Sequence, residues 1–142
     1  MNAVDSLQSC LAAEHAAVYG YGVLGGVLAV AAPGSANSRL AVLSYQAHRR
    51  QRDSLTELIA RLGATPVAAK PSYATPFRVN DVGSCRRLAR LIEDRVTAPY
   101  GVAVASTTGQ ARRSWAVAMS ECAVRRGDWG GKPEALPGLG RP

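Results

Sequence analysis

The sequence predicts an all-α protein, a four-helix bundle made of two antiparallel hairpins joined by a long crossover. In four segments, apolar residues recur at alternating steps of four and three, which is the period of a helix with one buried face. These segments span about residues 5–31, 37–62, 82–106 and 110–126. The connections alternate short, long, short, and the long one at 63–80 is rich in proline and has no helical period. The 142 residues fit one domain, a bundle over 1–126 followed by a Gly/Pro-rich tail over 127–142.

The first helix carries one carboxylate, Glu14, in the middle of its apolar seam. Asp5 is expected to cap its start, with Gln8 as the capping-box partner. The run from Ala16 to Ala32 contains no charge, so its length approaches that of a membrane span. Its small residues and the absence of basic flanks favour a buried helix and predict no membrane insertion.

The second helix places polar side chains on its inward face. Ser35 or Asn37 is expected at its N-cap, and Gly63 follows its last residue in the position that favours left-handed backbone. The helical period brings Tyr45, His48 and Arg52 onto the same seam as the buried leucines. We therefore expect these three side chains to point into the bundle.

The third and fourth helices repeat this arrangement. The third is expected to begin near Asp81 or Ser84 and carries Glu93 at the edge of its apolar face. The fourth carries Arg125 in line with its apolar stripe. In the tail, Trp129 is the residue expected to anchor the chain to its own bundle or to a partner.

The composition is that of a globular protein with a strong positive charge. The net charge is +7, with 47% hydrophobic and 19% charged residues. Three cysteines lie far apart at 10, 85 and 122, which indicates reduced thiols and neither a disulfide framework nor a thiolate zinc site. Acidic residues precede the first apolar run, so no signal peptide is predicted, and a cytoplasmic location is expected.

Four stretches of the sequence stand out together, at 11–22 (LAAEHAAVYGYG), 48–53 (HRRQRD), 71–73 (PSY) and 125–129 (RRGDW). They resemble an alanine-rich bacterial family within the ferritin-like superfamily, which is filed as a domain of unknown function. It implies a ferritin-like bundle and no known activity. Active ferritin-like proteins hold two metal ions, with one Glu from the first helix of each hairpin and an E-x-x-H motif from the second.

This chain keeps only part of that ligand set. Glu14 and Glu93 stand where the two single Glu ligands belong, but neither E-x-x-H is present, and the second helix offers only Tyr45-x-x-His48. Antiparallel helix register places Glu14 level with Arg52, and Glu93 level with Arg125. We therefore expect two Glu–Arg pairs in place of the metal ions, inside a buried polar cluster. Its members are Glu14, Tyr45, His48, Arg52, Glu93 and Arg125.

Three classes of function remain open. The first, which we favour, is a non-enzymatic structural or interaction protein without a cofactor, expected to form a homodimer because one bundle cannot cover every small-residue face of its first helix. The second is a protein that binds iron or another metal through Glu14, Glu93 and His48, with Tyr45 or Asp53.

The third class is a basic protein that binds nucleic acid or another polyanion through its +7 charge. Arginine pairs recur at 49–50, 86–87, 112–113 and 125–126. Neighbours on a helix diverge by about 100°, so these pairs do not form one stripe and nucleic acid is not the favoured partner. The remaining histidine, His15, is expected to pair with Tyr19 one turn later.

Overall fold

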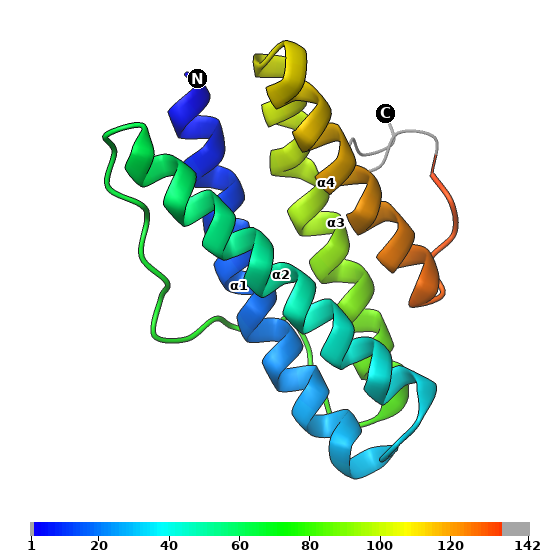
Figure 1. Cartoon of the computed structure of the whole chain (residues 1–142). Helices are drawn as coiled ribbons and strands as arrows, with labels where there is room; N and C mark the ends of the chain where they lie inside the picture. The colour runs from blue at the N-terminus through cyan, green and yellow to red at the C-terminus, as the bar shows by residue number, and fades with distance from the viewer. Residues whose placement is uncertain (1, 135–142) are drawn as a thin grey trace.

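The computed structural model of this chain describes residues 2–134 and contains four helices. They are α1 (Ala3–Ala31), α2 (Ala36–Arg61), α3 (Val82–Ser106) and α4 (Gly109–Asp128). Figure 1 shows α1 and α2 as one antiparallel hairpin, α3 and α4 as the other, and the long connection running back along the outside of the bundle. The predicted all-α four-helix bundle is confirmed.

The start of α1 differs from the prediction. Asn2 is the N-cap, and its side-chain oxygen accepts a hydrogen bond from the Asp5 amide at 2.9 Å, while Asp5 accepts from the Asn2 amide at 3.3 Å. Asp5 is therefore the partner within the capping box and not the cap itself, because Asn2 offers a capping side chain one turn earlier. The Gln8 side chain instead binds the crossover: it donates a hydrogen bond to the carbonyl of Thr65 and accepts one from the amide of Val67.

The other helix ends use side chains of the expected kind. Ser35 caps α2 and Asp81 caps α3. Gly63 follows the end of α2 with a φ of 80°, a left-handed conformation that costs glycine little. Helix α4 continues to Asp128, two residues into the predicted tail, and part of that tail, 135–142, lies outside the described residues.

Trp129 directly follows α4 and is fully buried. Its ring lies 6.2 Å from that of Tyr21 on α1, and its carbonyl accepts a hydrogen bond from Arg90 on α3 at 2.9 Å. The end of α4 is thus fixed against the bundle of its own chain.

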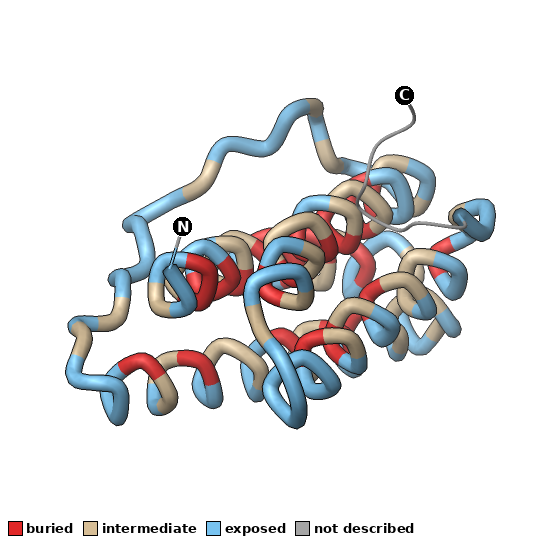
Figure 2. Tube along the Cα trace, turned by 90° about the horizontal axis from the view of Figure 1, so that it is seen from above, coloured by how far each residue is buried: buried red, intermediate tan, exposed pale blue. Residues whose placement is uncertain are grey.

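The four helices form three closely packed pairs, and these pairs do not close into a ring around the core. Helix α1 packs against α2 and α3, and α3 packs against α1 and α4, whereas α2 and α4 touch each other only sparsely within residues 2–134. Figure 2 shows the buried residues on the inward sides of the helices. A side chain on Gly20 would lie 2.6 Å from the end of Ile92, so glycine at this position permits the close approach of α1 to α3.

In the described part of the chain, no helix combines the length and the hydrophobicity that crossing a bilayer requires. The uncharged second half of α1 instead supplies core residues, among them Ala17, Leu24 and Leu28.

Candidate functional site

Three ionisable side chains from three helices meet at the centre of the bundle. Glu14 of α1, His48 of α2 and Glu93 of α3 are each at most 1% exposed. The Nδ1 atom of His48 lies 2.6 Å from Glu14 Oε2, and its Nε2 atom lies 3.0 Å from Glu93 Oε1. Both nitrogens of this one imidazole are therefore occupied by carboxylates.

His48 is held in its charged form. Burial by itself lowers the pKa of His48, but the hydrogen bonds and charges of Glu14 and Glu93 outweigh burial and raise that pKa from 6.5 to about 9. At neutral pH the ring is thus an imidazolium, and each N–H donates to one carboxylate. The result is a buried cation that bridges two anions.

Two tyrosines complete the carboxylate shells in a reciprocal pattern. Tyr21 of α1 donates its hydroxyl to Glu93 of α3 at 2.6 Å, and Tyr100 of α3 donates to Glu14 of α1 at 2.7 Å. On its own helix, each tyrosine lies two turns after the glutamate, on the same face. Because α1 and α3 are antiparallel, each tyrosine meets the glutamate of the other helix.

The sequence offered a signal for these two tyrosines. Tyr21 lies on the same apolar seam as Glu14, and Tyr100 follows Glu93 by the same interval. The predicted cluster nevertheless omitted both, because seam position alone does not distinguish a packed ring from a hydrogen-bond donor.

Arg125 of α4 supplies the second cation. Its Nε atom lies 3.2 Å and 3.3 Å from the two oxygens of Glu93, and its Nη2 atom lies 3.3 Å from Cys122 Sγ. Burial alone raises the pKa of Glu93, but His48 and Arg125 reverse that effect and lower it below its usual value. Glu14 and Glu93 are thus balanced by His48 and Arg125, so the cluster as a whole is neutral.

The predicted Glu14–Arg52 pair is not formed. Arg52 binds its neighbour Asp53 at 2.7 Å, with 25% and 65% of the two side chains exposed. A long arginine side chain can keep its charged end in water, whereas the shorter imidazole of His48, one turn away, reaches Glu14 inside the bundle. Register alone could not separate these two inward positions on α2.

Tyr45 also lies outside the cluster. Its ring packs under the guanidinium of Arg49, 5.6 Å from the ring centre, on the outer side of the α1–α2 hairpin. The central cluster therefore consists of Glu14, Tyr21, His48, Glu93, Tyr100 and Arg125.

The donor set fits a metal ion poorly. Within residues 2–134, no group of three or more His, Cys, Asp or Glu side chains is arranged to hold a metal ion. Glu14, His48 and Glu93 are adjacent, but a histidine ligates through a deprotonated nitrogen, and both nitrogens of His48 already lie at hydrogen-bond distance from a carboxylate. Asp53, a further candidate ligand, lies on the surface with Arg52.

The cysteines and the second histidine serve the packing of the bundle. Cys10, Cys85 and Cys122 are free and buried, and burial raises the pKa of Cys10 to about 12. His15 lies 2.9 Å from the carbonyl oxygen of Val67 in the crossover and does not pair with Tyr19 as predicted. Tyr19 packs against Tyr73, with ring centres 5.5 Å apart.

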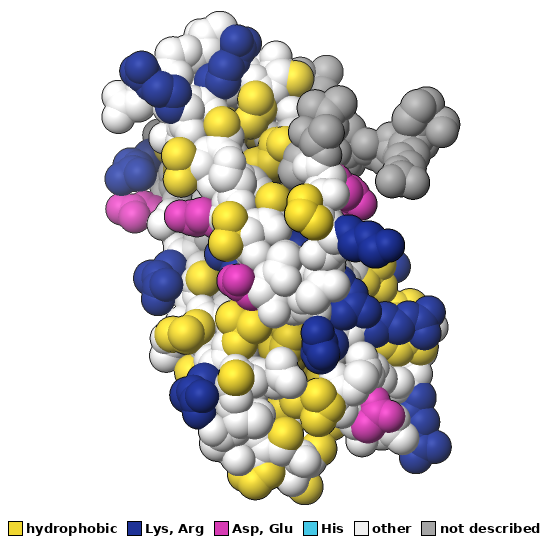
Figure 3. Space-filling model, turned by 90° about the vertical axis from the view of Figure 1, so that its right-hand side faces the viewer, with side chains coloured by type: hydrophobic (Ala, Val, Ile, Leu, Met, Phe, Trp, Pro, Cys, Tyr) yellow, Lys and Arg dark blue, Asp and Glu magenta, His cyan; other side chains and the backbone are white. Residues whose placement is uncertain are grey.

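On one face of the molecule, the positively charged side chains are spread out (Figure 3). Figure 3 shows Lys and Arg side chains distributed along the whole height of one face, with hydrophobic and acidic side chains between them. Several arginines also have local partners, such as Arg61 with Glu57 and Arg126 with Asp94. On this face (Figure 3) the arginines do not form the continuous basic stripe that is typical of nucleic-acid-binding proteins.

The fold and the buried cluster define a four-helix-bundle protein with a hydrogen-bonded, charged centre. The family model described as a domain of unknown function (DUF4439) matches residues 6–141, and the chain belongs to this family. Its structure is similar to the crystal structure of a conserved hypothetical protein from Mycobacterium tuberculosis, with 29% identity and a TM-score of 0.80. The similarity covers 90% of this chain and 95% of that one. No protein with a curated description matches the sequence.

Proposed function

We propose that this protein is a ferritin-like bundle that acts as a non-catalytic interaction protein and uses no metal cofactor. One observation carries the proposal: the single imidazole of His48 lies between Glu14 and Glu93, with one ring nitrogen at hydrogen-bond distance from each carboxylate. In a metal-binding relative the same two carboxylates would face metal ions. Here the charge of the metal is replaced by His48 and Arg125.

Charge balance supports a metal-free centre. Two carboxylates and two cations already compensate one another, and an uncompensated buried charge costs several kcal/mol. A divalent ion would have to displace the proton of His48 and would leave Arg125 beside an excess of positive charge. The hydroxyls of Tyr21 and Tyr100 occupy further carboxylate positions that ligation would use.

Burial supports the absence of catalysis. A general acid or base must come within hydrogen-bond reach of its substrate, directly or through a water. Glu14, His48 and Glu93 are at most 1% exposed, and their polar atoms already bond to one another. We therefore assign them to the stability and helix register of the scaffold, and assign the function to its surface.

Metal content tests this proposal. The protein, purified without chelator, is analysed for bound elements and then melted with and without added Fe²⁺, Mn²⁺ or Zn²⁺ under anaerobic conditions. We expect no stoichiometric metal and no rise in Tm, because only a ligand that binds the folded state stabilises it. Stoichiometric metal that raises Tm and is lost in Glu14→Gln would overturn the proposal.

A further inference from the structure

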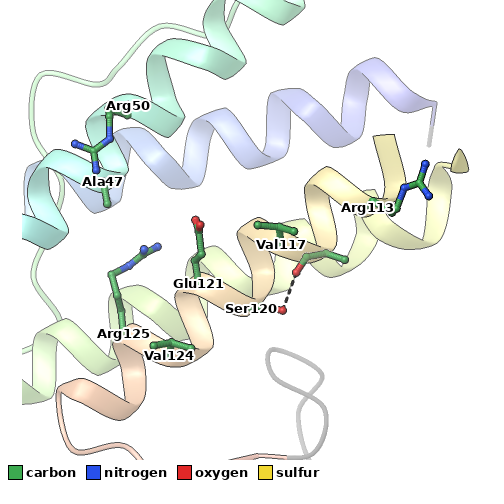
Figure 4. Close-up of a pocket in the computed structure, with 9 residues that line it drawn as sticks. Ala47, Arg50, Arg113, Val117, Ser120, Glu121, Val124 and Arg125 are labelled. Atoms are coloured by element: carbon green, nitrogen blue, oxygen red, sulfur yellow. Dashed lines mark hydrogen bonds between the residues drawn. The ribbon is translucent and has the colours of Figure 1, made fainter. Parts of the chain in front are cut away.

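An open groove runs between α2 and α4, which pack against each other at most sparsely within residues 2–134. Its volume is about 720 Å³, and Figure 4 shows its walls, with Ala47 and Arg50 from α2 and the remaining residues from α4. We define the α2–α4 groove by six of these residues, Ala47, Arg50, Arg113, Val117, Glu121 and Val124.

The floor of this groove is apolar and accessible. Val117 is 57% exposed and Val124 is 64% exposed, two turns apart on the same side of α4. A second hollow of about 530 Å³ continues past Arg113 and Val117 toward Leu58. Such an elongated apolar surface between two helices matches the shape of a groove that receives another helix.

The rim is positively charged. Arg50 and Arg113 lie at the groove, and within the described residues neither has a carboxylate at ion-pair distance. Arg125 also lines it, while Glu121 is the single acidic residue among the lining residues. This imbalance favours an acidic occupant, because complementary charge steers binding and rejects like-charged partners.

We infer that the α2–α4 groove binds an acidic amphipathic helix of a partner protein. From Arg113 to Val124 the groove spans about 16 Å along α4, which is roughly three turns of a bound helix. The apolar seam of that helix would cover Val117 and Val124, and its carboxylates would meet Arg50 and Arg113. A second copy of this chain fits less well, since facing grooves would bring the same arginines together.

This inference rests on the proposed interaction role, but its test does not depend on metal content. The probe is a displayed library of helix-forming peptides of about 14 residues, with a fixed Leu/Ala seam and flanking positions randomised among Glu, Lys and Gln. We expect selection on the purified protein to enrich Glu-flanked sequences. The variant Arg50→Glu/Arg113→Glu should weaken their binding about tenfold or more.

Arg49→Glu is the matched control, because Arg49 neighbours Arg50 on α2 but packs on Tyr45, outside the groove. This variant should retain the binding of the enriched peptides. Enrichment of Lys-flanked or neutral peptides, no enrichment, or an equal loss in Arg49→Glu would overturn the inference. A dimer that dissociates on Val117→Asp would assign the groove to a second copy, and would overturn it as well.

Discussion

Nδ1 of His48 lies 2.6 Å from Glu14 Oε2, across the interface of α1 and α2, and less than 2% of either residue is exposed. The same ring reaches Glu93 on α3 through its other nitrogen. One side chain thus joins three helices by charge-assisted hydrogen bonds, which are stronger than neutral ones.

Replacing His48 should destabilise the folded protein, because two buried carboxylates then lack their shared cation. His48→Asn leaves Glu14 and Glu93 without their shared cation and should lower the free energy of unfolding by about 3–5 kcal/mol. In a Glu14→Gln background the same change should cost less, because one of the stranded charges is gone. Denaturant melts of the two single variants and the double variant measure this coupling. His15→Asn is the control, and strictly additive losses would contradict the bridge.

The two inward-predicted arginines should behave differently. Arg52→Met removes a half-exposed pair with Asp53 and should cost about 0–1 kcal/mol. Arg125→Met removes the charged donor to buried Glu93 and should cost about 2–3 kcal/mol. Urea melts measure the free energy of unfolding of both variants. Equal losses for Arg52→Met and Arg125→Met would contradict the different roles assigned to the two arginines.

Stability should fall at alkaline pH because of His48. Its pKa is about 9 in the folded protein and 6.5 in the unfolded chain, so its contribution is complete below pH 6.5 and is lost as the pH rises through 9. Each unit of pKa difference corresponds to about 1.4 kcal/mol, so the loss is on the order of a few kcal/mol. Melts at pH 6, 7.5 and 9 test this, with His48→Asn expected to lack the slope.

At acidic pH, Glu93 should make stability change with pH in the opposite direction. The pKa of Glu93 is lowered in the folded state, so its contribution is present above its usual value of 4.5 and is lost as the pH falls through the folded pKa. The wild type should therefore be most stable between about pH 4.5 and pH 6.5, where Glu93 and His48 both contribute. A stability curve that is flat from pH 6 to 9 would contradict the charged state of His48.

Self-association remains a prediction of the sequence. Val30 at the end of α1 is 85% exposed and Val42 on α2 is 53% exposed, and we expect a second copy to cover such exposed apolar groups of the α1–α2 hairpin. Sedimentation velocity at micromolar concentration should show a dimer. A monomer at every concentration would argue against this interface, and it would leave the α2–α4 groove available to other partners.

The fold followed from sequence because its signals are local. Helical period, caps such as Ser35 and Asp81, and the proline-rich crossover each depend on neighbouring residues. The contact of Glu93 with Arg125 followed from register, since the second hairpin turns within a residue or two of the predicted point.

The other contacts of the site could not be predicted, because the helical period does not determine them. His48 and Arg52 share one seam, and only the three-dimensional packing decides which of them reaches Glu14. Tyr21 and Tyr100 bond across α1 and α3, an interface whose register is set by the long crossover and not by a short turn. The α2–α4 groove exists because α2 and α4 do not pack closely against each other. A periodic sequence pattern does not show which helices pack together.

The protonation state of His48 tests the central claim most directly. Long-range ¹H–¹⁵N correlation spectra of ¹⁵N-histidine-labelled protein distinguish an imidazolium from either neutral tautomer. At pH 7 both ring nitrogens of His48 should have the chemical shifts of protonated nitrogens, and the ring should titrate near pH 9. A neutral ring at pH 7, with one nitrogen unprotonated or bound to metal, would contradict the account.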